Sequence, residues 1–114
     1  MFKSMDCKNM NDIREAIDSI DENIVKLISQ RAKYVQKASE FKQSEIAVRD
    51  EKRVKAVISS KKELANKYGV SSTLIETLYT NMIDYFIKEE MVEWKNRIID
   101  EHAIKASKTA KRVF

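Results

Sequence analysis

Apolar residues recur at alternating steps of three and four positions along the first third of the chain. This spacing is typical of one face of a long amphipathic helix. We expect the helix to begin at the Asn9–Asp12 cluster, whose side chains can cap free amides, and to run to about Lys42. Its face carries Ile13, Ile17, Ile20, Ile24, Ile28, Arg31, Val35, Ala38 and Lys42.

Two further helices are predicted in the rest of the chain. One begins near Asp50, an expected N-cap, and ends at Tyr68 and Gly69, where the glycine suits a left-handed terminator. The other opens at Thr73–Glu76, which has a capping-box pattern, and extends past Ile98 towards residue 104. The apolar face of this last helix carries Ile75, Tyr79, Met82, Ile83, Phe86, Ile87 and Trp94.

The scarcity of turn-forming residues points to a fold class. The chain has one glycine and no proline among 114 residues, too few turn residues for a sheet protein. We therefore predict an all-α fold of three helices, long, short and long, in a single domain over residues 1–114, with about 1–8 and 105–114 flexible. The segment Gln43–Arg49 is either a loop that folds over a ligand or a simple linker.

Three helices of such unequal length leave the long ones partly uncovered. We therefore expect an intertwined homodimer, in which a second copy covers the exposed apolar faces.

Composition narrows the function classes. The net charge is +4, from 22 basic and 18 acidic residues, and the excess gathers in the tail from Lys105 to Arg112. Elsewhere both signs alternate, so we do not expect nucleic-acid binding. The single Cys7 suits a reducing compartment. No segment predicts a signal peptide or a membrane span, so a cytoplasmic location is expected.

Two cations break the apolar face of the first helix. Arg31 and Lys42 lie on its centre line, where leucine or isoleucine is expected, and such charges are seldom buried unless paired. An arginine fork and a lysine ammonium together suit a small dianion between them. The alternative is that both side chains reach outward to solvent or pair with internal carboxylates.

Glu90 is a third exception, because it falls between Phe86 and Trp94 on the apolar face of the last helix. Burial disfavours the charged form of a carboxyl group, and a protonated Glu90 could donate a hydrogen bond to a ligand oxygen. Alternatively, it forms an ion pair with Arg31 or Lys42 across the core. The residues leave both interpretations open.

Other candidate residues carry weaker signals. Arg14 lies seventeen residues from Arg31, about 25 Å along a helix, so it can join the same small site only from another subunit. Arg53 opens the second helix, where it is either a surface residue or a ligand for a carboxylate. His102 is the only histidine, and a nucleophilic role for Cys7 is not expected. No metal and no cofactor are predicted.

These residues resemble a known family. The segments are Asp12-Ile-Arg-Glu-Ala-Ile-Asp18, Ile20-Asp21, Ile24-Val25, Arg31, Tyr34-Val35, Phe41-Lys42-x-Ser-Glu45, Arg53-Val54 and Ile87-x-Glu-x-x-x-x-Trp94. They resemble the all-α chorismate mutases over residues 6–97, and most closely the isochorismate-pyruvate lyase branch, which supplies salicylate for siderophores.

The resemblance implies an intertwined dimer with two active sites and no cofactor or metal. It implies that Arg31, Lys42 and Arg53 hold the carboxylates and ether oxygen of a dicarboxylate substrate, with Arg14 supplied by the partner subunit and Glu90 near the ether oxygen. The reaction is pericyclic, and the protein holds a reactive conformer and stabilises charge on the breaking ether bond.

Two positions depart from the family pattern. Val54 stands where typical mutases of this fold have a glutamate for the substrate hydroxyl, which favours the lyase. Glu90 stands where the bacterial lyases have glutamine, which weakly favours the mutase. We predict isochorismate-pyruvate lyase activity, with chorismate mutase as the alternative or a side activity. A non-catalytic helical dimeric binding module is a further alternative, and it requires its cations on the outer face.

Overall fold

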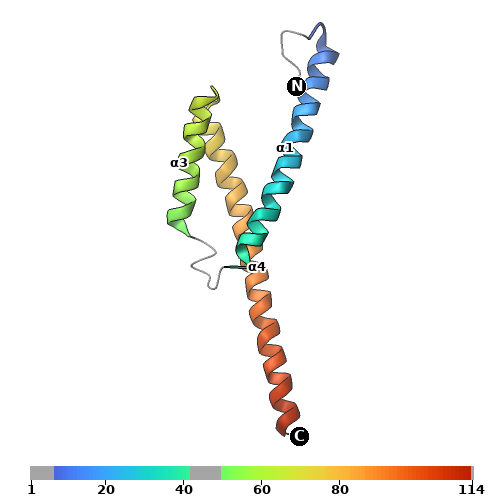
Figure 1. Cartoon of the computed structure of the whole chain (residues 1–114), viewed down its shortest axis with the longest axis vertical. Helices are drawn as coiled ribbons and strands as arrows, with labels where there is room; N and C mark the ends of the chain where they lie inside the picture. Colours follow the sequence, from blue (N-terminus) through green and yellow to red (C-terminus); the bar gives the residue numbers. More distant parts are fainter. Residues whose placement is uncertain (1–6, 42–49, 114) are drawn as a thin grey trace. The chain divides into compact units, whose positions relative to one another are not determined.

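The computed structural model describes residues 7–41 and 50–113, with side chains described as far as Glu101. Three helices occupy this part of the chain: α1 (Met10–Ser39), α3 (Glu51–Lys67) and α4 (Ser72–Val113), and no strand occurs in it (Figure 1). The predicted all-α class with a long-short-long order is confirmed. The chain forms two compact units, Met1–Ala38 and Ser39–Phe114, which are described in turn. A single domain stays a prediction.

The start of α1 is held by two hydrogen bonds between backbone amides and side chains. The amide of Asp12 donates to the side-chain oxygen of Asn9 at 2.9 Å, and the amide of Lys8 donates to the Asp12 carboxylate at 3.0 Å. The predicted cap is therefore confirmed, because a free amide of the first turn finds an acceptor on Asn9 and Asp12 ties down the residue that precedes the cap. The helix ends at Ser39, earlier than expected. Lys42 and the segment 43–49 lie outside the described residues.

Both ends of α3 follow the prediction. The amide of Arg53 donates to the Asp50 carboxylate at 3.1 Å, which makes Asp50 the N-cap. At the other end Gly69 has a φ of +71°, and the amide of Val70 donates to the carbonyl of Ala65 at 2.9 Å. This is the hydrogen-bond pattern of a glycine-terminated helix, in which a left-handed residue returns the chain to the last carbonyls.

The predicted start of α4 was wrong. The N-cap is Ser71, whose hydroxyl accepts from the amide of Leu74 at 3.2 Å, while Thr73 lies inside the first turn. The expected capping-box partner, Glu76, instead forms an ion pair with Lys62 of α3 at 3.1 Å. Ser71 lies directly before the first helical residue, Ser72, so its hydroxyl and not that of Thr73 is placed to cap the helix.

The far end of α4 is longer than the sequence predicted. The helix continues to Val113, beyond the expected end near residue 104. Flexibility of residues 105–114 stays a prediction. Among the described residues, no helix has both the length and the apolar character needed to cross a membrane.

The core of the second unit lies between α3 and α4. Ile83 and Ile87 are each 8% exposed, and Val54, Val57, Ile58, Tyr79 and Met91 pack against them. Along α3, Val54 meets the Ile83–Ile87 region of α4, whereas Lys62 reaches back to Glu76. The two helices are therefore antiparallel, and Figure 1 shows them side by side. We call this pair the α3–α4 hairpin.

Two apolar helix faces remain open in the single chain. The five isoleucines of the α1 stripe are 39–50% exposed, and a second row on α4 is 50–63% exposed. The α1 stripe comprises Ile13, Ile17, Ile20, Ile24 and Ile28; the α4 row comprises Leu74, Leu78, Tyr85, Val92 and Ile99. Rows of exposed apolar residues such as these often mark an interaction site, whereas single exposed apolar residues do not.

Candidate functional site

The two α1 candidates are placed by one unbroken helix. Arg31 continues the isoleucine stripe and is half-buried, with its Nη1 nitrogen shielded from solvent. Arg14 is exposed near the start of the same helix. Because α1 is helical throughout Met10–Ser39, the two residues stand about 25 Å apart along its axis. The guanidinium groups of one α1 therefore cannot grip the same small anion.

Glu90 is the buried acid of the second unit. It is only 6% exposed, although carboxylates are rarely buried to this extent. Its position on α4 is one turn beyond Ile87 and next to Met91, so the apolar core of the α3–α4 hairpin extends to its side chain. The predicted inward position of Glu90 is therefore confirmed.

Arg53 lies at the same end of the hairpin as Glu90. It occupies the first turn of α3, where its amide is held by Asp50 and its side chain is exposed. Both residues are far from the turn that joins the helices. Arg53 lies about 24 Å along α3 from Gly69, and Glu90 lies about 28 Å along α4 from Ser71. Since the helices are antiparallel, a buried acid and an exposed cation share the open end of the hairpin.

Val54 has a structural role at this end. It is half-buried and packs against the cluster of Ile83 and Ile87. The side chain therefore seals the core beside Glu90, where a polar residue would add another hydrogen-bonding group. Of the remaining candidates, Lys42 lies outside the described residues, and Arg14 and Arg31 belong to the other unit.

One tyrosine on the exposed row of α4 has a perturbed acidity. The pKa of Tyr85 is raised above 10.0 because its hydroxyl donates to Glu89 and the carboxylate charge opposes formation of a phenolate. Tyr85 lies on the outer row of α4, away from the buried face that carries Glu90. It is therefore no part of the candidate site. Within the described part of the chain, no three histidine, cysteine, aspartate or glutamate residues are grouped to hold a metal.

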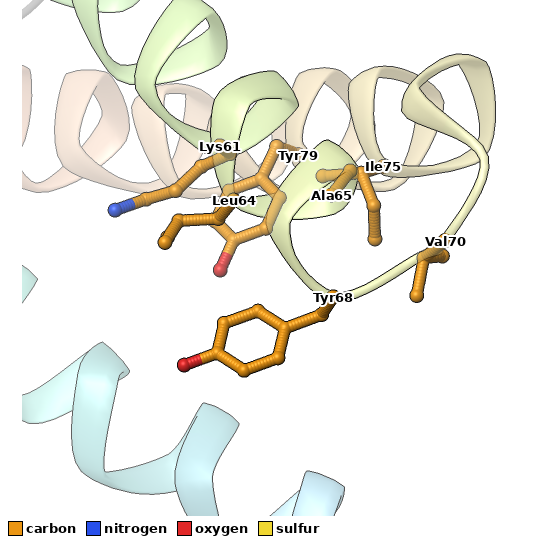
Figure 2. Close-up of a pocket in the computed structure, with 7 residues that line it drawn as sticks. All are labelled: Lys61, Leu64, Ala65, Tyr68, Val70, Ile75 and Tyr79. Carbon is orange, nitrogen blue, oxygen red and sulfur yellow. The ribbon is translucent and has the colours of Figure 1, made fainter.

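Sequence reasoning missed a pocket at the turn end of the hairpin. It is lined by Lys61, Leu64, Ala65, Tyr68, Val70, Ile75 and Tyr79 (Figure 2). Tyr79 was predicted only as a core residue, and the others near the turn were not singled out for chemistry. The sequence did contain a pattern that could have predicted this pocket. Positions 61, 64, 65 and 68 share one helical face, and that face places a lysine among apolar and aromatic residues.

Comparison with known proteins identifies the family. The profile of the chorismate mutase type II family matches residues 13–91, which include Arg14, Arg31, Arg53 and Glu90. The chain is also 38% identical over 90 residues to a protein of Pseudomonas aeruginosa named isochorismate pyruvate lyase, covering 79% of this chain and 89% of that protein. The chain therefore belongs to the chorismate mutase type II family, a family of enzymes.

Proposed function

We propose that this protein is an isochorismate-pyruvate lyase. The observation that carries the proposal is the 38% identity to a protein of that name over 89% of its length. The buried Glu90 supports it, because Arg53 lies towards the same end of the α3–α4 hairpin and an acid and a cation together suit a polar site. The substrate is a dicarboxylate, and the candidate site supplies cations to match it.

The reaction follows from the chemistry of the substrate. The ether bond of isochorismate breaks, pyruvate leaves and the ring becomes the aromatic ring of salicylate. The enolpyruvyl CH₂ becomes the methyl group of pyruvate, so one ring hydrogen moves to it and no co-reactant is needed. Arg31 and Arg53 bind the carboxylates, while Lys42 and Glu90 act at the ether oxygen. Their contribution is to hold a reactive conformer and stabilise developing charge.

The site is completed by a second copy of the chain. The α1 stripe leaves five isoleucines 39–50% exposed, and a second α1 offers the same apolar surface. Arg14 and Arg31 lie too far apart on one helix to share a ligand, so Arg14 acts in the site of the partner subunit. The homodimer thus both buries the stripe and completes each site.

Chorismate mutase is the second candidate function. Glu90 favours it, because some mutases of this fold use glutamate at this position. Val54 favours the lyase, because it stands where typical mutases have a glutamate for the substrate hydroxyl. In the mutase reaction the same site would rearrange chorismate to prephenate. We propose it as a side activity. Cytoplasmic salicylate supply for siderophores is the role expected for the lyase.

Offering isochorismate and chorismate separately to the purified protein tests these assignments. The proposal expects salicylate and pyruvate from isochorismate in equal amounts. Prephenate from chorismate without salicylate from isochorismate would identify a mutase instead. If neither is turned over and neither raises the melting temperature, the protein is a non-catalytic helical module, because a bound substrate stabilises the folded state by mass action.

A further inference from the structure

The pocket at the turn end of the α3–α4 hairpin is separate from the candidate active site. Tyr79 precedes Glu90 by eleven residues on α4, which is about 16 Å along the helix. The cavity measures about 180 Å³ and is formed within the second unit alone. In Figure 2 the side chains of Lys61 and Tyr68 extend away from the helices, whereas Ala65 and Ile75 lie close to their ribbons. It is therefore a second concave site.

The pocket combines a cation with aromatic walls. The ammonium of Lys61 lies 6.0 Å from the centre of the Tyr79 ring, and no acidic residue lines the cavity. Glu76, in the first turns of α4, is paired with Lys62 at 3.1 Å. The positive charge of Lys61 is therefore available to an anion that enters the pocket.

The volume suits a ligand of one ring. A cavity of about 150 Å³ accepts benzene, whereas drug-sized ligands need roughly 300 Å³ or more. An apolar helix seated here would cover the charge of Lys61 without pairing it, which is costly. An aromatic acid satisfies both features, because its ring meets Tyr79, Leu64 and Ile75 while its carboxylate meets Lys61.

We propose that this pocket binds a small aromatic monocarboxylate. The ring lies against the apolar wall of the hairpin, and the carboxylate pairs with Lys61. Salicylate, the ring product of the proposed lyase reaction, belongs to this class. Only that link rests on the proposed function, and the site itself rests on the geometry of the pocket.

Methyl-labelled NMR of the full-length protein tests the site directly, with benzoate as the probe. Saturable shifts are expected at the methyl groups of Leu64, Val70 and Ile75. Replacing Lys61 with methionine keeps most of the stem and removes the charge, so binding weakens about ten-fold. Lys62→Met is the matched control, since it removes the same charge outside the pocket and leaves binding within about two-fold.

Three outcomes overturn the proposal. One is that benzoate leaves these methyl signals unchanged at saturating concentration, as expected if a second copy fills the pocket. A second is that Lys61→Met binds as tightly as the wild type, and a third is that neutral benzyl alcohol binds as tightly as benzoate. Isochorismate turnover is measured in the same samples. If benzoate shifts the methyl signals but isochorismate is not turned over, the proposed function fails and the pocket stands. If isochorismate is turned over but benzoate shifts no methyl signal, the pocket fails and the proposed function stands.

Discussion

At the scale of single residues, the decisive feature is an acid inside an apolar core. Glu90 is 6% exposed, one turn beyond the buried Ile87, and a carboxylate there must be protonated or paired. The site chemistry depends on which of these holds with substrate bound. A neutral acid donates a hydrogen bond to the ether oxygen, whereas an ionised one repels it.

Replacing Glu90 with glutamine tests this role. The amide can still donate a hydrogen bond to the ether oxygen, so we expect Glu90→Gln to keep kcat within about three-fold of the wild type. Glu90→Ala removes the donor, and we expect it to lower kcat by about 10²-fold or more. Glu89→Ala, on the exposed side of α4, is the control and keeps the wild-type kcat. A wild-type kcat in Glu90→Ala would contradict the role.

Replacing Lys42 with alanine tests the cation at the ether oxygen. Loss of one preorganised charge that acts in the transition state costs about 10²–10³-fold in kcat, so we expect at least this loss with an unchanged melting temperature. The exposed Lys33 of α1 provides a control, because Lys33→Ala removes the same charge elsewhere. Activity within about three-fold of wild type in Lys42→Ala would refute the assignment.

At the scale of elements, local chemistry explains most helix ends. Asp50 and Gly69 could be assigned from sequence because an N-cap carboxylate and a left-handed glycine act within a few residues. Thr73–Glu76 misled the prediction because Glu76 pairs with Lys62 on another helix, a contact between helices that local pattern does not show. The pocket of Lys61 and Tyr79 went unpredicted for the same reason.

The corrected cap of α4 gives a stability prediction. Ser71→Ala removes the side-chain acceptor of the Leu74 amide and should lower the free energy of unfolding by about 1 kcal/mol. Thr73→Ala leaves that cap in place and should change it by less than about 0.5 kcal/mol. Urea unfolding measures both values. A larger loss of stability for Thr73→Ala than for Ser71→Ala would show that Thr73, and not Ser71, caps the helix.

Among the site residues, those that break a periodic pattern were the most predictable. Arg31 and Glu90 stand out because a charge interrupts an apolar stripe, and the structure confirms that Arg31 is half-buried and Glu90 buried. Arg53 breaks no stripe, so its position left a surface role and a ligand role open, and the family resemblance favoured the ligand role. The residues of the turn pocket come from two helices, and their proximity depends on how α3 and α4 pack.

At the scale of the whole molecule, the uncovered α1 stripe is the surface that the proposed homodimer would bury. Ile20 lies at its centre and is 39% exposed, so Ile20→Glu should place a charge in the proposed dimer interface and yield monomers. Val25, 67% exposed and off the centre line, is the matched control, and Val25→Glu should remain dimeric. Analytical ultracentrifugation reports the result. A dimeric Ile20→Glu variant would place the interface elsewhere.

The central claim is that each lyase site combines Arg31 of one chain with Arg14 of the other. Arg14→Ala and Arg31→Ala homodimers should each form little salicylate from isochorismate. A co-expressed mixture should recover about a quarter of the wild-type rate, because half of the dimers are mixed and each has one intact site of two.

The most direct measurement is therefore the rate of salicylate formation by that mixture. Recovery to about a quarter of the wild-type rate is the predicted result. No recovery above the two separate variants, with mixed dimers verified by differential tags, would contradict the shared site.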